Sequence, residues 1–113
     1  MENRLLINCK YKVDFIDVSQ ITFVKADEGY SHIHLNDQSV YVQTKTLSEV
    51  HELIGDFGFI KVCQSYLVNI EYIQSLDKKT REVILKCGYR IPYTLNLKQL
   101  IGMVEGYFNL NKA

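Results

Sequence analysis

The stretch of sequence that decides the fold runs Phe59-Ile60-Lys61-Val62-Cys63-Gln64-Ser65-Tyr66-Leu67-Val68-Asn69. Its first residues, Phe59–Val62, have the apolar and β-branched character of a strand, and a compact stretch of mixed character, Cys63–Asn69, follows. We expect more strand at Ile70–Ser75. The stretch therefore combines β structure with a cation, an amide and a hydroxyl beside apolar residues.

The segments upstream read as a β-meander, because short apolar runs alternate with residues that favour turns. The expected strands are Leu5–Cys9, Val13–Ile16, Ile21–Ala26, Tyr30–Leu35 and Val40–Gln43. Side chains alternate along a strand, so the fourth of these has two distinct faces. Tyr30, His32 and His34 lie on the polar face, and Ser31, Ile33 and Leu35 lie on the apolar one.

A helix is expected after Thr46-Leu47-Ser48-Glu49, which has the Thr-x-x-Glu spacing of a capping box. The apolar residues of this helix share one stripe that we expect to pack on the sheet, namely Leu47, Val50, Leu53 and Ile54. Gly55 is suited to the left-handed residue that ends many helices.

The C-terminal part reads as a hairpin with its tip at Lys78-Lys79-Thr80, then short strands at Arg81–Lys86 and Tyr89–Tyr93. A last helix is expected from about Leu97. Its apolar residues at helical spacing are Leu97, Leu100, Ile101, Val104 and Phe108.

Composition excludes several classes of protein. The 113 residues suffice for one domain, and 13 Lys and Arg balance 13 Asp and Glu, which argues against nucleic-acid binding driven by bulk charge but leaves a local basic face open. Three separate cysteines predict neither a disulfide framework nor a zinc site. The sequence has no apolar run near the roughly 20 residues of a membrane span, and Met1–Arg4 resembles no secretory signal. We expect a cytoplasmic protein without membrane contact.

Enzyme chemistry finds no support in the motifs. His32 and His34 share a strand face but lack a third ligand nearby in sequence, so no metal is predicted, and His51 is read as a solvated surface residue. Cys63 has no evident activating base. Phosphate-binding glycine loops and hydrolase elbows are absent from the sequence. We therefore expect neither an enzyme nor a bound cofactor.

The basic residues indicate a different chemistry, because most lie at strand ends and turns from which they could reach phosphates. They are Lys10, Lys12, Lys45, Lys61, Lys78, Lys79, Arg81 and Arg90. Lys61 and Ser65 could hold phosphates. Gln64 could donate to and accept from an adenine edge in the major groove.

The stretch from Phe59 to Asn69 resembles the signature F-x-R-[IV]-H-x-S-[YF]-[LIV]-V-N of LytTR DNA-binding domains. Upstream, the segment from Ile21 to Tyr30 resembles the family's I-x-[YF]-[IV]-E-A-x-x-x-Y, and Thr46-Leu47-Ser48-Glu49 its T-L-x-E helix start. Downstream, Ile91-Pro92-Tyr93-Thr94 is similar to I-P-V-S. The match spans about residues 5–108, and we expect residues 1–113 to form a single domain of this type.

The resemblance implies a mainly β, elongated fold of small antiparallel sheets with one or two short helices, whose loops enter the major groove of duplex DNA. The implied DNA contacts are Ser31 or His32, Lys61, Gln64 and Thr94, to which the residue chemistry adds Ser65 as a phosphate contact. Tyr66, Val68 and Asn69 are implied to support the signature loop. As partners it implies double-stranded DNA, a possible second copy on repeated half-sites, and a receiver domain or kinase pathway of a bacterial response regulator.

The chain departs from the family at three positions. Lys61 replaces a common Arg, Cys63 a common His, and Leu95 an Arg after the I-P-V-S segment. A bidentate Arg–guanine contact contributes about 1–3 kcal/mol of discrimination, and Leu95 cannot form one. The alternative function is therefore a protein-interaction or scaffolding module that kept the fold and lost the DNA contacts.

Overall fold

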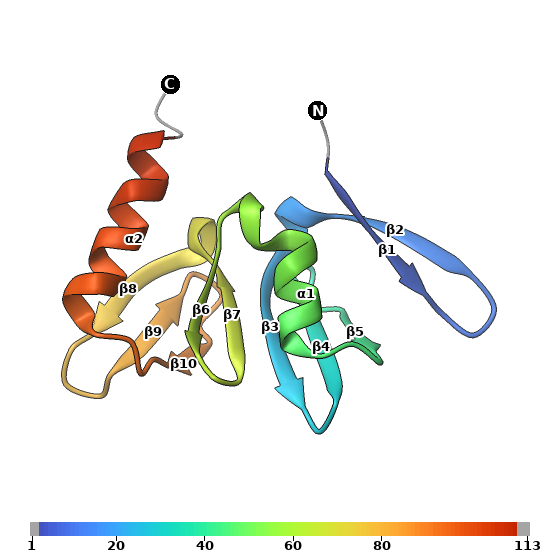
Figure 1. The fold of residues 1–113 in the computed structure, drawn as a ribbon, viewed down its shortest axis with the longest axis horizontal. Helices are drawn as coiled ribbons and strands as arrows, with labels where there is room; N and C mark the ends of the chain where they lie inside the picture. Colours follow the sequence, from blue (N-terminus) through green and yellow to red (C-terminus); the bar gives the residue numbers. More distant parts are fainter. Residues whose placement is uncertain (1–2, 111–113) are drawn as a thin grey trace.

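The computed structural model describes residues 3–110, so Met1 and Glu2 of the N-terminal segment considered above lie outside the described residues. The chain forms three antiparallel sheets of two, five and three strands, placed side by side, together with two α-helices (Figure 1). The molecule is elongated, with extents of 44 × 35 × 24 Å. The mainly β, elongated fold expected from the sequence is confirmed.

The first sheet is a two-stranded ribbon of β1 (Arg4–Asn8) and β2 (Val13–Asp17), which projects from one end of the molecule (Figure 1). One face of the ribbon buries Leu5 and Ile7 in the core. On the other face Leu6 pairs with Phe15 across the strands, and both side chains are exposed. The ribbon therefore adds to the core and also presents an apolar outer face.

The central sheet joins the meander to the signature stretch. Its strands are β3 (Ile21–Asp27), β4 (Tyr30–Leu35), β5 (Val40–Gln43), β6 (Phe59–Cys63) and β7 (Tyr66–Asn69), in the order β5-β4-β3-β7-β6. Its two faces bury separate hydrophobic clusters. Along β3, Val24 packs in the cluster that includes α1, and Phe23 packs in the cluster shared with the third sheet and α2.

The third sheet has the order β10-β9-β8 and covers the second cluster. Its strands are β8 (Ile73–Asp77), β9 (Glu82–Leu85) and β10 (Arg90–Pro92), and α2 (Leu97–Leu110) follows them. Helix α2 is anchored by the buried Leu100. It is also anchored by the Tyr107 hydroxyl, which donates to the Glu71 carboxylate at 2.9 Å.

Helix α1 (Leu47–Ile54) begins at the predicted capping box. The Glu49 amide donates to the Thr46 hydroxyl at 3.2 Å, and the Thr46 amide donates to the Glu49 carboxylate at 3.1 Å. Two details of the prediction were wrong. Gly55 is right-handed, because a short 3₁₀ turn continues the helix to Phe57 and Gly58 (φ +89°) is the left-handed residue. Leu53 is half exposed, because the sheet covers the rest of the apolar stripe but not this residue.

The strand expected at Ile70–Ser75 was wrong in its first half. Residues Ile70–Tyr72 form a 3₁₀ helix, and β8 begins only at Ile73. The Asn69 side chain accepts a hydrogen bond from the Glu71 amide at 3.0 Å, which draws the backbone out of extended geometry. Strand β9 starts one residue later than expected, because Arg81 adopts a left-handed φ of +58° in the turn.

Candidate nucleic-acid interface

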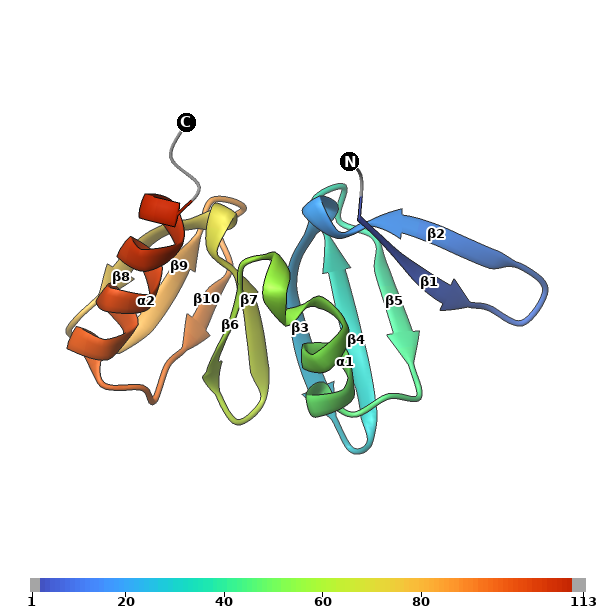
Figure 2. The same cartoon turned by 45° about the horizontal axis from the view of Figure 1, so that its top comes forward.

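Three connections meet along one edge of the molecule. They are the β3–β4 turn at Glu28-Gly29, the β6–β7 turn at Gln64-Ser65, and residues 94–96 between β10 and α2, all at the lower edge in Figures 1 and 2. Backbone hydrogen bonds tie them together: Ala26 N donates to Ser65 O at 2.8 Å, and Thr94 N donates to Val62 O at 3.0 Å. Residues far apart in the sequence therefore share one edge.

The β6–β7 turn exposes the two polar residues of the signature. Gln64 and Ser65 are both exposed at its tip. The pairing of β6 with β7 shifts register between Lys61 and Cys63, an irregularity that bends a strand and re-aims its side chains. Because the Ser65 carbonyl is fixed by β3, the turn presents an amide and a hydroxyl from an anchored backbone.

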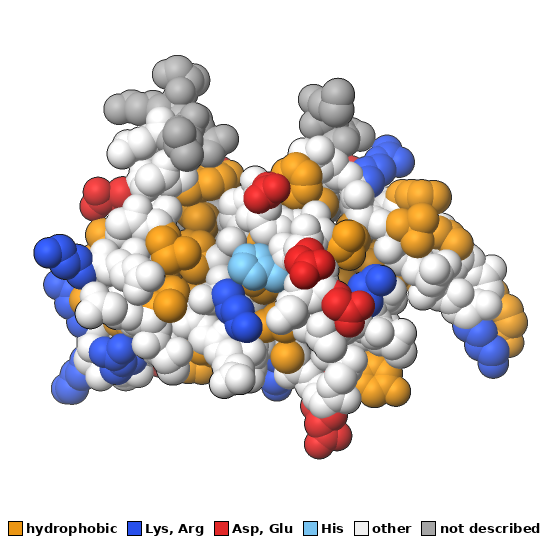
Figure 3. Space-filling view, in the orientation of Figure 1, with side chains coloured by type: hydrophobic (Ala, Val, Ile, Leu, Met, Phe, Trp, Pro, Cys, Tyr) orange, Lys and Arg blue, Asp and Glu red, His pale blue; other side chains and the backbone are white. Residues whose placement is uncertain are grey.

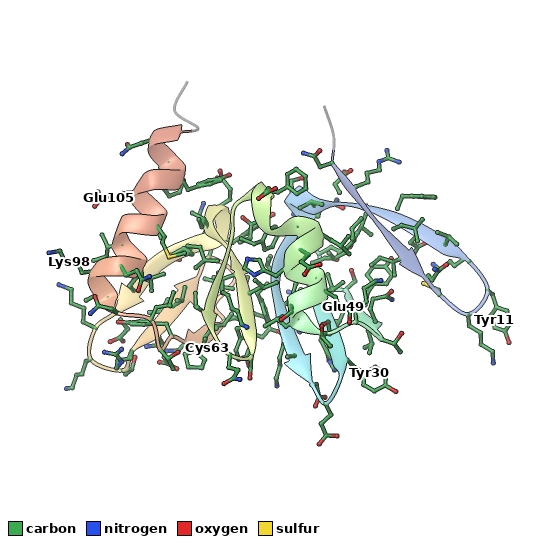
Figure 4. The ribbon with its side chains drawn as sticks, viewed as in Figure 1. Tyr11, Tyr30, Glu49, Cys63, Lys98 and Glu105 are labelled. Atoms are coloured by element: carbon green, nitrogen blue, oxygen red, sulfur yellow. The ribbon has the colours of Figure 1, made fainter. Side chains whose placement is uncertain are left out.

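Lys61 lies on β6, three residues before Gln64, and is half exposed. Its neighbours Ile60 and Val62 are buried in the cluster under the third sheet, so alternation directs Lys61 to the opposite face, where α1 lies. Cys63 is half-buried beside the turn (Figure 4). The thiol therefore stands near the edge where the family commonly has an imidazole.

The strand β4 offers only one of its two predicted contacts. Ser31 is 0% exposed, and its hydroxyl donates to the Lys45 carbonyl at 2.6 Å, so this hydroxyl is not available to DNA. His32 points to the other face and is partly exposed. Its Nε2 atom lies 3.5 Å from the Asp27 carboxylate, which leaves His32 as the candidate on this strand.

Thr94 is exposed at the edge, and Arg81 lies beside the same segment. The Arg81 guanidinium stands 5.2 Å from the centre of the Tyr93 ring and donates to the Leu95 carbonyl at 3.4 Å. The sequence placed Arg81 among many basic residues but gave no reason to pair it with Leu95. The turn that brings the two together depends on the β9–β10 pairing.

The three residues implied to support the loop have different positions. Tyr66 packs into the second cluster and lies 6.1 Å from Phe23, ring centre to ring centre. Val68 is fully buried. Asn69 lies at the far end of β7, where its side-chain amide donates to the Ile21 carbonyl at 2.8 Å, so it fixes the strand rather than the tip.

The charges along the edge are mixed. Figure 3 shows acidic side chains at the tip of the β3–β4 hairpin, where Asp27 and Glu28 lie, and Lys and Arg side chains over the end formed by the third sheet. Farther along β4, away from the tip, the His34 ring stacks on the Phe23 ring at 4.1 Å between ring centres. Burial, with smaller contributions from the charges of His32 and Lys25, lowers the pKa of His34 below its usual 6.5.

Other chemistries find little support. Within residues 3–110 no group of three or more His, Cys, Asp and Glu side chains is placed to hold a metal ion. No helix of that part of the chain is long and apolar enough to cross a membrane. The predicted pair His32 and His34 shares a face, as expected, but the His34 ring packs against Phe23 and Tyr89.

The chain is similar to known DNA-binding domains and regulators. Residues 11–101 match the model of the LytTr DNA-binding domain family. The sensory transduction protein LytT of Bacillus subtilis (strain 168) is 27% identical over 107 residues, which cover 88% of this chain but only 44% of that relative. The chain thus spans less than half the length of the curated relative it matches.

A solved LytTr DNA-binding domain from Bacillus cereus has the same fold, with a TM-score of 0.69 over 100% of both chains at 14% identity. The resemblance carried by the signature stretch is confirmed. Since the family model matches most of the chain, and the three sheets and two helices agree with the solved domain, the chain belongs to the LytTR family of DNA-binding domains.

Proposed function

We propose that this chain binds duplex DNA with sequence selectivity, as a bacterial transcription regulator, through loops that enter the major groove. The observation that carries the proposal is the single edge on which Gln64, Ser65 and Thr94 are exposed from turns joined by backbone hydrogen bonds. Residues 1–113 would act as one domain of this kind. The proposal includes no catalytic step.

Gln64 is the proposed base-reading residue. Its amide offers a donor and an acceptor together, which matches the N6 and N7 edge of adenine in the major groove. Lys61 and Ser65, on either side of it, would hold phosphates and fix the register of the loop on the duplex. His32 would contact the DNA backbone from the opposite face of the sheet, where its Nε2 atom lies 3.5 Å from the Asp27 carboxylate.

Arg81 is proposed to replace the cation that Leu95 removes. The guanidinium lies over Tyr93 and against the Leu95 carbonyl, on the segment that carries Thr94. It can form phosphate or guanine contacts there, because its contacts to Tyr93 and Leu95 occupy few of its five N–H donors. Arg81, from the turn between β8 and β9, would thus supply the cation that position 95 lacks.

The partners of the chain follow from the same reasoning. Two copies on repeated half-sites would double the base contacts that one edge makes and so raise the specificity. The relative LytT is described as a sensory transduction protein, and control of this chain by a receiver domain or a kinase pathway is therefore proposed.

The proposal is tested by fluorescence anisotropy on a duplex enriched from a random pool. Gln64→Ala should lose about 1–3 kcal/mol of discrimination at one A·T pair, because the bidentate contact is gone. Lys61→Ala and Arg81→Ala should weaken binding to all sequences and reduce the salt slope by about one each.

Matched controls are Gln20→Ala and Lys86→Ala, because both residues are exposed. Gln20 precedes β3 and Lys86 follows β9, so both lie at the strand ends opposite the edge. Unchanged DNA affinity in both Gln64→Ala and Lys61→Ala would refute the contact assignment. The chain would then fit the protein-interaction module better.

A further inference from the structure

A hollow of about 340 Å³ lies between the β1–β2 ribbon and helix α1. Leu6 lines it from the ribbon, Leu53 from α1, and Phe57 from the turn after α1. Gln64, Ser65 and Thr94 are not among the residues that line it. His32 does not line it either, although Lys45 at its rim accepts a hydrogen bond from Ser31, the neighbour of His32 on β4.

The walls of the hollow hold apolar side chains that the fold leaves uncovered. Leu6 is 48% exposed, Leu53 50% and Phe57 40%. Leu53 belongs to the apolar stripe of α1 whose other members are buried on the sheet. Single exposed apolar residues are ordinary, whereas several that converge on one concave surface from separate elements mark interaction sites.

The apolar surface extends beyond the hollow onto the ribbon. Phe15 pairs with Leu6 across the strands and is also exposed. In Figure 3 hydrophobic side chains gather over the ribbon and beside α1 on the same face. Such a surface is wider than the hollow itself and suits an extended polymer better than a compact small molecule.

The charged residues that line the hollow are both cations. They are Arg4 and Lys45, and neither Asp nor Glu lines it. Arg4 forms an exposed ion pair with Asp17 at 3.6 Å. Lys45 also acts on the Glu49 carboxylate, as the weakest of the effects that lower its pKa, and it is the cation on which the argument rests. An occupant with apolar side chains and a carboxylate would match both the walls and this charge.

We propose that the hollow binds a short segment of a partner protein, which inserts apolar side chains between Leu6, Leu53 and Phe57 and places a carboxylate near Lys45. DNA fits the site less well than such a segment, because its phosphates would meet Arg4 and Lys45 but not the three apolar walls. Since none of the proposed DNA contacts lines the hollow, one domain can hold DNA and the partner together.

The experiment is a selection of displayed random peptides on the whole chain, after depletion on a Leu53→Ser/Phe57→Ser variant. An enriched peptide is then synthesised with a fluorophore and titrated by anisotropy. Enriched peptides should combine apolar residues with Asp or Glu. Their affinity should fall at least about tenfold in Leu53→Ser and in Phe57→Ser, the scale of anchor residues in interfaces.

Charge exchange provides a second test that does not touch the apolar walls. Lys45→Glu should weaken the acidic peptide and favour a peptide whose carboxylate is replaced by Lys. Gln64→Ala should leave peptide affinity unchanged, whereas Leu53→Ser should leave DNA affinity unchanged, so failure of one proposal is distinguishable from failure of the other. Circular dichroism and urea denaturation verify that each variant is folded.

Three results would overturn the proposal. The first is a selection with no enriched peptide, and the second is a set of peptides that bind the Leu53 and Lys45 variants as well as the original chain. The third is self-association in light scattering that Leu53→Ser abolishes, because a second copy would then fill the hollow.

Discussion

Asn69 joins segments of the chain that lie far apart in sequence. Its side-chain amide donates to the Ile21 carbonyl at 2.8 Å, and its side-chain carbonyl accepts from the Glu71 amide at 3.0 Å. The residue is 2% exposed, so water cannot replace these partners. Asn69, the last residue of the signature, thus joins β3, β7 and the turn that follows by hydrogen bonds.

Asn69→Ala should therefore lower the free energy of unfolding by about 1–3 kcal/mol, because a buried donor and a buried acceptor lose their partners. Urea denaturation measures the change. Asn109→Ala is the matched control, since Asn109 is exposed on α2, and should stay within about 0.5 kcal/mol. Equal effects of the two substitutions would contradict this structural role of the Asn69 hydrogen bonds.

His34 provides a pH dependence with a defined sign. Burial lowers its pKa in the folded protein below 6.5, with smaller contributions from His32 and Lys25. A lowered pKa means that the unfolded chain binds the proton more readily. The stability that neutral His34 contributes is thus fully present above 6.5 and is lost as the pH falls from 6.5 through the folded-state value.

Urea denaturation at pH 7.5 and at pH 5.5 should therefore show a smaller loss of stability for His34→Phe than for the original chain. Phe keeps a ring against Phe23 and Tyr89 and cannot titrate. The same pH dependence in both proteins would assign it to other groups.

Sequence reasoning at the residue scale was partly sufficient. The positions of Gln64, Ser65 and Thr94 followed from the signature and the family resemblance, and all three are exposed at one edge. Strand alternation already placed Ser31 on the apolar face, yet the resemblance kept Ser31 and His32 as equal candidates. Arg81 could not be assigned, because its contact with Leu95 depends on hairpin pairing that no local pattern specifies.

At the scale of elements, the turn after α1 depends on Gly58. This residue has φ +89°, and a Cβ added to it would lie 2.5 Å from Cε1 of Tyr107. The Tyr107 ring has little freedom to move, because its hydroxyl is bonded to Glu71. Gly88 has a similar φ of +97°, with nothing within 4 Å of such a Cβ. A side chain at Gly88 would therefore cause backbone strain alone, whereas a side chain at Gly58 would cause backbone strain and a steric clash.

Gly88→Ala should cost about 1–2 kcal/mol of unfolding free energy, which is the cost of a left-handed residue with a side chain. Gly58→Ala should cost more, by about 1–3 kcal/mol for the displaced packing. Equilibrium unfolding in urea provides both values. A Gly58 variant no less stable than the Gly88 variant would mean that α2 moves aside freely.

The elements that local patterns specify were predicted well. The bounds of β4, β5 and α1 and the start of α2 agree with the sequence, because alternation and the capping box are local signals. The Ile70–Tyr72 turn was missed, since its cause is one side-chain hydrogen bond from Asn69. Leu53 was placed on the buried stripe, because periodicity identifies a face but not the width of what covers it.

At the scale of the whole molecule, hydrophobic periodicity in the sequence could not predict the order of strands in the central sheet. The pairing of β3 with β7 joins residues such as Val24 and Leu67, and only the family resemblance implied a fold of this kind. That pairing is also what brings the β3–β4 and β6–β7 turns to one edge. The candidate site is therefore a product of topology more than of any single motif.

A chain of zero formal net charge needs local charge to bind DNA. In the proposed complex Lys61 and Arg81 would supply it, next to the exposed Lys78 and Lys79 of the turn before Arg81, whereas Asp27 and Glu28 would oppose it at the β3–β4 tip. Phosphate contacts carry no sequence information directly, so the selectivity should depend on base contacts such as that of Gln64.

The most direct test of DNA reading by the lower edge is selection of the whole chain on a random duplex pool, followed by anisotropy titration of the enriched site at several salt concentrations. We expect one enriched motif with an A·T pair that depends on Gln64. Its affinity should fall at least about tenfold between about 50 and 200 mM salt. No enriched motif, or binding that is weak and independent of sequence, would contradict the account.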